Sequence, residues 1–295
     1  MKNRQLLIID GSSLLSSSFY GTARELMLAK TEEQKKMAYE KLMKSSDGRY
    51  TNGIYAFMKT LLKIIKEQNP TYIAIVWDLT RNSFRKTELY EDYKGTRKET
   101  PGPLKEQFGT VQELLEGILP QYKSSIEDSV IYEADDFAGS LGRRFESEVT
   151  CKFFTRDEDY LQLVSSCSSV YLVTNKFKEL YDEVRLNPEE FNIPYGVFEY
   201  TLENLEAIKG LKPHQIPDYK GLCGDSSDNI PGVKGIGPKV ALPLLKAYDT
   251  IENIYLEIEG LDKTREEDLV KFFKESLGIA TNSIKIYQKE NKLLS

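Results

Sequence analysis

The residues of this chain that could do chemistry are carboxylates that follow apolar runs. The run Leu6–Ile9 ends at Asp10, and the run Thr71–Trp77 ends at Asp78. The other acids of this kind follow later apolar runs or lie in a glycine-rich segment: Glu133, Asp135, Asp136, Asp157, Asp159, Asp225 and Asp228. Carboxylate-rich sites bind hard divalent ions such as Mg²⁺ or Mn²⁺. Two such ions roughly 4 Å apart catalyse hydrolysis of phosphodiester bonds, so the pattern indicates a two-metal hydrolase.

Composition argues against several other kinds of site. The single histidine, His214, excludes a multi-histidine metal centre, and no Gly-x-Ser-x-Gly sequence supplies a serine nucleophile. Three scattered cysteines without a Cys-x-x-Cys pair indicate reduced thiols in a cytoplasmic protein and no structural zinc. The net charge of 40 − 46 = −6 argues against a protein that coats nucleic acid, although it allows local basic patches. The sequence contains no apolar stretch of transmembrane length, and the first apolar run is too short for a signal peptide.

The segment Gly224–Lys239 combines the last two acids with glycines. Its two aspartates are spaced so that their carboxylates share one face of a turn or helix start. The glycines before a predicted helix at Val240–Tyr248 are Gly232, Gly235 and Gly237. We expect positive φ at the last two, which would let backbone N–H groups approach a phosphate backbone. The spacing between Gly232 and Gly237 resembles that of a P-loop, but Pro238 and Lys239 stand where a P-loop has Lys and Ser/Thr, so nucleotide binding by a P-loop is excluded. An ordinary surface turn remains the alternative.

The most basic stretch of the chain, Arg81–Lys98, also contains aromatic residues. Its cations are Arg81, Arg85, Lys86, Lys94, Arg97 and Lys98. Tyr90 and Tyr93 are interleaved with them. Because cations neutralise phosphates and aromatic rings stack on bases, this mixture suits single-stranded or frayed nucleic acid. Acidic residues lie in the same stretch, so a solvated charged loop remains an equal alternative.

Hydrophobic patterning predicts the elements that position the acids. The predicted strands are Arg4–Asp10, Thr71–Asp78, Ser129–Glu133, Cys151–Thr155, Ser169–Thr174 and Lys178–Val184. The predicted helices are Ser12–Lys30, the charged and exposed Thr31–Asp47, an amphipathic helix capped by Thr51, Pro101–Leu119, and a helix from Asp135 to about Glu146. The apolar face of the amphipathic helix consists of Ile54, Phe57, Met58, Leu61, Leu62 and Ile65. Beyond Leu186 we expect helices, and beyond Tyr200 a helical lobe that ends in Thr264–Ser276 and Thr281–Lys289.

Alternating strands and helices predict an α/β protein with a doubly wound, mostly parallel sheet. The carboxyl ends of parallel strands meet at one edge of such a sheet, where ligands bind. We therefore expect the acids that end the strands to lie together at this edge. Asp10 could also cap the following helix through its side chain.

Several short motifs resemble, in order and spacing, those of the 5′-nuclease superfamily, the flap endonucleases and 5′–3′ exonucleases. They are Ile9–Gly11, Trp77–Asp78, Ser83–Arg85, Tyr93–Arg97, Glu133–Asp136, Asp157–Asp159 with Gln162–Leu163, and Gly224–Lys239. The resemblance covers about Leu6–Tyr248 and is greatest to the type that forms the N-terminal part of bacterial DNA polymerase I. Since no polymerase portion follows, we expect a free-standing nuclease. The resemblance implies a PIN-like sheet flanked by helices and a helical lobe with a helix-hairpin-helix-like motif.

The resemblance also implies a role for each of these residues. All nine carboxylates match metal-ligand positions, for two Mg²⁺ ions that Mn²⁺ can replace. Lys94 and Arg97 match a catalytic basic pair beside the scissile phosphate, whereas Arg85 and Tyr93 match substrate-binding positions, the tyrosine for base stacking. The motif that holds the duplex backbone, in many members with a bound K⁺, is matched by Gly232, Gly235, Gly237 and Lys239.

The chain departs from the family pattern at several positions. Ser17 lies where relatives usually have arginine, which implies one phosphate contact fewer. Arg156 replaces a usual glycine and Glu158 a usual lysine in the segment that contains Asp157 and Asp159. The stretch Ala29–Asp47 is longer and more charged than in relatives. Because no metal ligand is changed, we expect an active enzyme.

Two domains are expected. Residues 1–185 form the α/β catalytic domain, with an arch or gateway for the 5′ strand at about 79–103, and residues 186–295 form the helical lobe, with its motif at about 221–248. The expected protein is a monomer that cuts DNA flaps, frayed 5′ ends or RNA primers paired to DNA, in replication and repair, without membrane contact. A PIN-type ribonuclease is one alternative, although such enzymes lack the glycine-rich lobe. A non-catalytic DNA-structure-binding protein is another, although no acid is missing.

Overall fold

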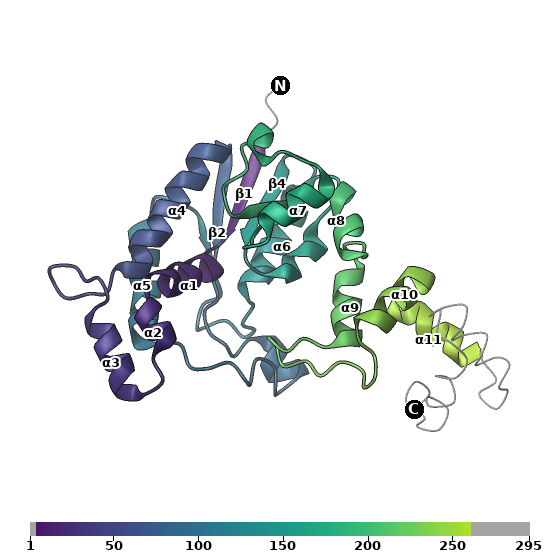
Figure 1. Cartoon of the computed structure of the whole chain (residues 1–295), viewed down its shortest axis with the longest axis horizontal. Coiled ribbons are helices and arrows are strands. Elements are labelled where there is room, and N and C mark those ends of the chain that lie inside the picture. The colour runs from purple at the N-terminus through teal and green to yellow at the C-terminus, as the bar shows by residue number, and fades with distance from the viewer. Residues whose placement is uncertain (1–3, 261–295) are drawn as a thin grey trace. The chain divides into compact units, whose positions relative to one another are not determined.

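The computed structural model describes residues 4–260, and these residues form two compact units (Figure 1). The sheet unit comprises residues 4–90 and 98–201, and the helical unit comprises residues 91–97 and 202–260. The short segment 91–97 therefore belongs with the C-terminal helices although it lies between two parts of the sheet unit in sequence.

The sheet unit is built on six strands in the order β3-β2-β1-β4-β5-β6. The strands are β1 Gln5–Asp10, β2 Tyr72–Val76, β3 Gln121–Tyr122, β4 Thr150–Thr155, β5 Ser168–Val173 and β6 Val197–Tyr200. All neighbours pair in parallel except β5 and β6. Ile9 of β1 lies opposite Ile75 of β2 and Phe154 of β4. The chain runs outward from β1 through β2 to β3 and then returns to the other side of β1, so the topological switch point lies between β1 and β4.

Helices cover both faces of this sheet (Figure 1). On one face, α1 Gly11–Thr22, α4 Asn52–Gln68 and α5 Gly102–Leu115 pack over a fully buried core that includes Leu7, Ile9, Ile75, Trp77 and Phe57. On the opposite face lie α6 Ala134–Phe145 and α7 Phe177–Val184. Strand side chains alternate between the two faces, so each buried strand contributes apolar residues to both layers. The predicted α/β class with a mostly parallel sheet is confirmed.

The amino end of α4 is held by a side chain from another helix. Thr51 occupies the cap position, as predicted, but its side chain makes no capping hydrogen bond. Instead Gln107 of α5, which is fully buried, accepts from the N–H groups of Gly53 and Ile54 at 2.7 and 3.1 Å. The predicted apolar face of this helix is wrong at Leu62, which is 61% exposed, because Ile64 takes the inward position.

The predicted helix Ser12–Lys30 breaks at Ala23 into α1 and α2 Arg24–Leu28. The charged stretch after it contains α3 Glu32–Glu40, which begins with a capping box between Thr31 and Gln34. The remaining short helices of the sheet unit are η1 Arg85–Leu89, η2 Glu158–Leu163 and η3 Pro188–Phe191.

Two predicted strands are wrong. Ser129–Glu133 forms no strand, and the two residues of β3 pair with β2 in its place. Lys178–Val184 lies within helix α7, whose apolar residues Phe177, Leu180, Tyr181 and Val184 follow a helical spacing. The chain beyond Leu186 was expected to be helical, but β6 pairs antiparallel with β5 there. The Tyr181 ring packs 4.6 Å from that of Phe198, so burial against β6 supports the helix.

The helical unit contains α8 Leu202–Lys209, α9 Gln215–Cys223, α10 Pro238–Tyr248 and α11 Ile251–Gly260. The glycine-rich segment forms the loop between α9 and α10, as the sequence predicted for a helix-hairpin-helix-like motif. The predicted helices Thr264–Ser276 and Thr281–Lys289 lie outside the described residues. Between residues 4 and 260, no helix combines the length and apolar character that a membrane crossing requires.

Candidate active site

Asp10 is the centre of the candidate site in the sheet unit. It ends β1 beside the switch point, is 6% exposed, and caps α1 by accepting from the Ser13 N–H at 2.9 Å. Its second oxygen accepts from the Thr155 hydroxyl of β4 at 2.8 Å. Burial raises the pKa of Asp10 to about 7, and the negative charges of Asp78 and Asp157 add to the increase. The carboxylates of Asp78 and Asp157 are therefore close enough to oppose the ionisation of Asp10, as expected for acids at one edge of a parallel sheet.

Asp78 connects this edge to the start of α6. Its N–H donates to the Ser12 hydroxyl at 2.8 Å, and its side chain accepts from the N–H of Ala134 at 2.9 Å. Since Ala134 begins α6, the carboxylate lies at the positive end of that helix.

The acids at the start of α6 surround Arg85. The guanidinium forms a bidentate ion pair with Asp136 at 2.7 and 2.8 Å and lies 3.5 Å from Glu133 and 3.6 Å from Asp135. Burial lowers the pKa of Arg85, but hydrogen bonding to Asp136 and the surrounding negative charge outweigh it and raise the pKa. Glu133 is itself buried and accepts from the Ser83 hydroxyl at 2.8 Å. The predicted substrate-binding arginine thus neutralises predicted metal ligands in this structure.

Asp157 and Asp159 follow β4 at the start of η2. The Asp159 N–H donates to the Asp157 carboxylate at 2.9 Å, which fixes the turn. Next along the chain, the Tyr160 hydroxyl is buried and has no hydrogen-bond partner among residues 4–260. Burial raises its pKa, and so do the charges of nearby carboxylates, with Asp10 the largest of these. A buried hydroxyl without a partner, beside acids that repel one another, fits a site that holds hydrated cations.

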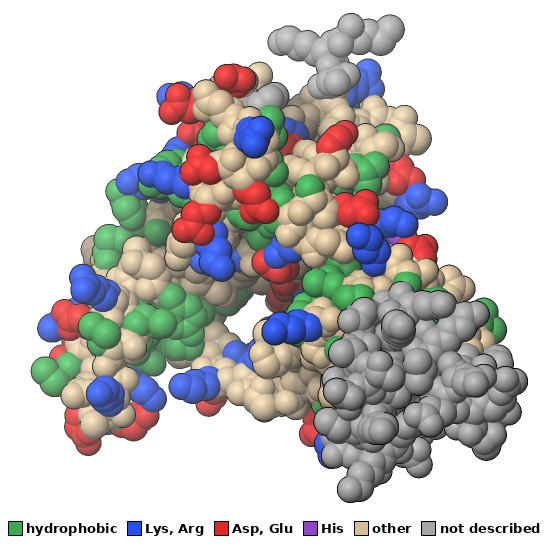
Figure 2. Space-filling view, turned by 45° about the vertical axis from the view of Figure 1, so that its right-hand side comes forward, with side chains coloured by type: hydrophobic (Ala, Val, Ile, Leu, Met, Phe, Trp, Pro, Cys, Tyr) green, Lys and Arg blue, Asp and Glu red, His purple; other side chains and the backbone are tan. Residues whose placement is uncertain are grey.

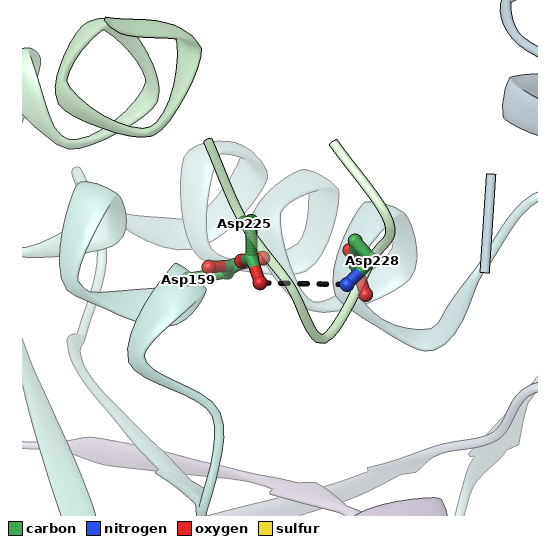
Figure 3. A group of neighbouring side chains, drawn as sticks. All are labelled: Asp159, Asp225 and Asp228. Atoms are coloured by element: carbon green, nitrogen blue, oxygen red, sulfur yellow. Dashed lines mark hydrogen bonds between the residues drawn. The ribbon is translucent and has the colours of Figure 1, made fainter. Parts of the chain in front are cut away.

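Asp225 and Asp228 lie on a turn of the helical unit (Figure 3). The Asp228 N–H lies 3.4 Å from Asp225 Oδ1, so the predicted placement on one turn is found. Asp225 also pairs with Lys220 at 2.7 Å and accepts from Ser227. Burial raises the pKa of Asp225, but the hydrogen bonds from Lys220 and Ser227 outweigh it and lower the pKa to about 2. Asp159, drawn in the same figure, belongs to the sheet unit.

The basic segment 91–97 is attached to the helical unit through Asp228. The side chain of Asp228 accepts from the Tyr93 hydroxyl at 3.0 Å and pairs with Arg97 at 2.6 Å. Its carbonyl oxygen accepts from the N–H of Lys94, which has a φ of +55°. The Tyr93 ring is buried, so in this arrangement it offers no open face to a base.

The loop between α9 and α10 depends on two glycines whose backbones touch. Gly224 and Gly232 have φ of +79° and +67°, and a Cβ on Gly232 would lie 2.3 Å from the Gly224 nitrogen. Gly235 has a φ of +88°, as expected. The expectation of positive φ is wrong for Gly237, which has a φ of −120° and open space around a Cβ. Lys239 is exposed in the first turn of α10.

Sequence reasoning missed the hydroxyl groups that orient the acids. Ser12, Ser83 and Thr155 each bond to a predicted metal ligand or to its backbone, and Lys220 pairs with another. The available signals were that Ser12 and Thr155 lie at strand ends two residues from an acid, and that Ser83 belongs to the motif Ser83–Arg85. Figure 2 shows acidic and basic side chains interspersed on the visible face, in agreement with the net charge of −6 and the absence of a continuous basic coat there.

Family models match both units. The model of the 5′–3′ exonuclease N-terminal resolvase-like domain matches residues 5–192, and that of the 5′–3′ exonuclease C-terminal SAM fold matches residues 211–289. A 5′–3′ exonuclease of Halalkalibacterium halodurans is 35% identical over 266 residues, which cover 89% of this chain and 76% of that protein. One from Aquifex aeolicus is 32% identical over 96% of this chain and 82% of its own length. DNA polymerase I of Caldicellulosiruptor bescii is 34% identical over 90% of this chain, which spans only 27% of the polymerase.

Solved structures show the same fold. A bacteriophage T5 flap endonuclease, in a complex with DNA and metal ions, aligns with a TM-score of 0.60 and 18% identity over 99% of this chain and 86% of its own. The T5 5′-exonuclease with bound zinc aligns with a TM-score of 0.60 and 17% identity over 98% of this chain and 100% of its own. The fold predicted from the resemblance is therefore confirmed. From its sequence matches over both units, this chain belongs to the 5′–3′ exonuclease family and is a nuclease.

Proposed function

We propose that this chain is a Mg²⁺-dependent, structure-specific 5′ nuclease that cuts DNA at flaps and frayed 5′ ends, and RNA primers paired to DNA. The observation that carries the proposal is the environment of Asp10. This carboxylate is buried at the switch point of the sheet, and its pKa is raised by burial and by Asp78 and Asp157. Divalent cations would remove the cost of this accumulated negative charge.

We propose that the nine predicted carboxylates hold two Mg²⁺ ions. All are oxygen ligands, which suits Mg²⁺ and allows Mn²⁺ to replace it. Bound ions would neutralise charge on the phosphate and activate the attacking water. The T5 structures that contain zinc, or DNA with metal ions, support a divalent-ion requirement here.

The chain's own residues orient these ligands and bind the phosphate. Ser13 and Thr155 hold the two oxygens of Asp10 through separate hydrogen bonds, so its carboxylate cannot rotate away. Lys94 and Arg97 are proposed to bind the scissile phosphate. Arg97 donates to Asp228 in the structure, so we propose that it exchanges this carboxylate for a substrate phosphate. We propose that Arg85 likewise exchanges its ion pair with Asp136 for one with a substrate phosphate.

Binding of duplex DNA is assigned to the loop between α9 and α10. Gly235 is exposed and has a positive φ, so the backbone turns there without a side chain in the way, whereas Gly232 packs against Gly224 and shapes the loop. Lys239 follows in the first turn of α10 and can contact a phosphate. We also propose a K⁺ ion at this loop, since carbonyl oxygens are the ligands that K⁺ takes in proteins.

We propose residues 1–185 as the catalytic domain, with an arch or gateway at about 79–103, and residues 186–295 as the helical lobe, although β6 at Val197–Tyr200 still pairs with the sheet. We propose that the protein acts as a monomer in the cytoplasm, in replication and repair. The three cysteines are free thiols in the structure, which fits that compartment.

The decisive experiment is incubation with a 5′-flap duplex labelled on the flap, with Mg²⁺ or with EDTA. We expect cleavage near the junction in Mg²⁺ and none in EDTA, and Asp10→Asn should abolish it. Asp182→Asn, at an exposed aspartate of α7, is the matched control that removes a carboxylate outside the site and should cleave normally.

Other outcomes would support the alternatives. Cleavage of single-stranded RNA with no preference for a flap would favour a PIN-type ribonuclease. Tight flap binding without cleavage in either Mg²⁺ or Mn²⁺ would favour a non-catalytic DNA-structure-binding protein.

A further inference from the structure

A pocket of about 410 Å³ lies in the sheet unit, beside the acids and separate from them. It occupies the face of the sheet that α1 and α4 cover, where these helices meet the ends of β4 and β5. Its apolar wall includes Leu14 and Ile64 from the helices, and Phe154, Val173 and Val197 from the strands. The volume lies in the range of roughly 300–1,000 Å³ that is typical of small-molecule sites.

The charged residues that line this pocket are both cations. They are Lys63 of α4 and Arg156, which follows β4. The lining contains no aspartate or glutamate, although acids outnumber bases in the chain by 46 to 40. Lys63 has a partner on its own helix, Glu67, at 3.7 Å and is half exposed. The Arg156 guanidinium, in contrast, has no ion pair among residues 4–260. A ligand of this pocket is therefore expected to be an anion.

The rest of the lining suits the other parts of a nucleotide. Serine and threonine side chains of α1 and α4, among them Ser17 and Thr60, supply hydroxyl groups beside the apolar wall. Tyr195 also lines the pocket; its ring packs at 4.7 Å, edge to face, with that of Phe177, and the residue is still 74% exposed, which leaves part of the ring surface for contact with a base. An aromatic ring and an apolar wall bind a base, hydroxyl groups bind a sugar, and a guanidinium binds a phosphate.

The pocket adjoins the candidate active site through shared residues. Ser13 and Thr155 line it, and both donate hydrogen bonds to Asp10. The backbone N–H of Arg156 lies 3.3 Å from the Ser13 hydroxyl oxygen, and this hydrogen bond holds the arginine backbone at the start of α1. A ligand in the pocket would therefore lie next to the acids at which a phosphodiester bond is cut.

We propose that this pocket binds one nucleoside 5′-monophosphate unit, with its base against the apolar wall and Tyr195 and its phosphate at Arg156. The choice of a nucleotide over other organic anions rests on the nuclease function proposed above. Two sources share this chemistry, a mononucleotide released by the exonuclease reaction and an unpaired terminal nucleotide of a DNA strand.

The test is calorimetric titration of the full chain with thymidine 5′-monophosphate in EDTA, where no cleavage occurs. Thymidine alone and inorganic phosphate alone are titrated in parallel. Arg156→Gln should weaken binding of the monophosphate by about 10- to 100-fold, the loss expected for one charge-assisted contact. Arg144→Gln, at another exposed arginine of the sheet unit that does not line the pocket, is the control and should bind normally.

A second arm distinguishes the two sources. Affinity is measured in EDTA for a blunt duplex and for the same duplex with one unpaired terminal nucleotide, with wild type, Arg156→Gln and the pocket-filling Thr60→Phe. Selective loss of affinity for the unpaired end in both variants assigns the pocket to the substrate strand. Binding of the free monophosphate without such selectivity assigns it to the released product.

The proposal is overturned if Arg156→Gln changes neither binding of the monophosphate nor affinity for the unpaired end. It is also overturned if inorganic phosphate binds as tightly as the monophosphate, because the apolar wall would then contribute nothing. Thermal unfolding of each variant separates loss of binding from loss of folding. Because no arm requires catalysis, failure here is distinct from failure of the Mg²⁺-dependent activity in the flap assay.

Discussion

Asp10→Asn removes a buried negative charge from the candidate site while keeping the shape of the side chain. The amide oxygen can still accept from the Ser13 N–H, and the amide NH₂ can donate to the Thr155 hydroxyl that now donates to Asp10. The substitution therefore tests the cost of the charge rather than the loss of a hydrogen bond. We expect it to stabilise the protein in EDTA at neutral pH.

The magnitude follows from the pKa. The pKa of Asp10 rises from an ordinary 3.8 to about 7, through burial first and then Asp78. The folded state therefore holds its proton more tightly than the unfolded chain, and stability falls as pH rises through this window. At about 1.36 kcal/mol per pH unit, the charge costs about 2 kcal/mol near pH 5 and about 4 kcal/mol near pH 8. Above about pH 7 the cost stays constant.

The assay is urea unfolding of wild type and Asp10→Asn in EDTA across this pH range. The free-energy difference between the two proteins should grow by about 2–3 kcal/mol from about pH 5 to about pH 8, with the variant more stable. Asp182→Asn controls for the loss of one carboxylate from an exposed position. Adding Mg²⁺ should stabilise wild type more than the variant, because the ions bind the ionised form.

A difference in unfolding free energy between wild type and Asp10→Asn that does not change with pH would refute the reasoning, since it would show that Asp10 ionises normally. A variant less stable than wild type at neutral pH would show that the hydrogen bonds, and not the charge, dominate at this position.

Gly232→Ala is expected to lower the free energy of unfolding by at least about 2 kcal/mol, because its Cβ would lie 2.3 Å from a backbone nitrogen at a φ of +67°. Gly237→Ala, at a φ of −120° with open space around the added Cβ, should unfold like wild type in the same denaturation series. Equal losses of unfolding free energy in Gly232→Ala and Gly237→Ala would contradict this. Asp228→Asn removes the ion pair to Arg97 at 2.6 Å, so limited trypsin digestion with mass spectrometry should show faster cleavage after Arg97; an unchanged rate would mean that the segment is held by other contacts. Lys94→Ala should slow single-turnover flap cleavage by about 10²–10³-fold while flap affinity in Ca²⁺ changes only a few-fold. A variant that binds poorly but cleaves normally at saturation would leave Lys94 as a phosphate clamp.

Much of the fold could be predicted because it is encoded locally. Apolar runs that end in an acid predicted β1, β2 and β4, and the parallel sheet placed Asp10 and Asp78 at one edge. The two wrong strands are both short: Ser129–Glu133 contains three apolar residues in a row, and Lys178–Val184 mixes three apolar residues with four charged ones. Such segments fit a strand or a helix equally well by pattern, and burial against neighbours decides between them.

The sequence by itself determined which side chains could do chemistry, the order in which they occur, and the family to which the chain belongs. The tertiary structure alone decided their partners. Arg85 meets Asp136 across 51 residues and Arg97 meets Asp228 across 131, and it is only through folding that such distant groups come together. The same holds for Gly237, whose φ depends on how the loop meets α10, and for the pocket at Arg156, whose walls come from separate helices and strands. Patterning records which face of an element is buried, whereas the identity of the partner on that face is set by packing between elements.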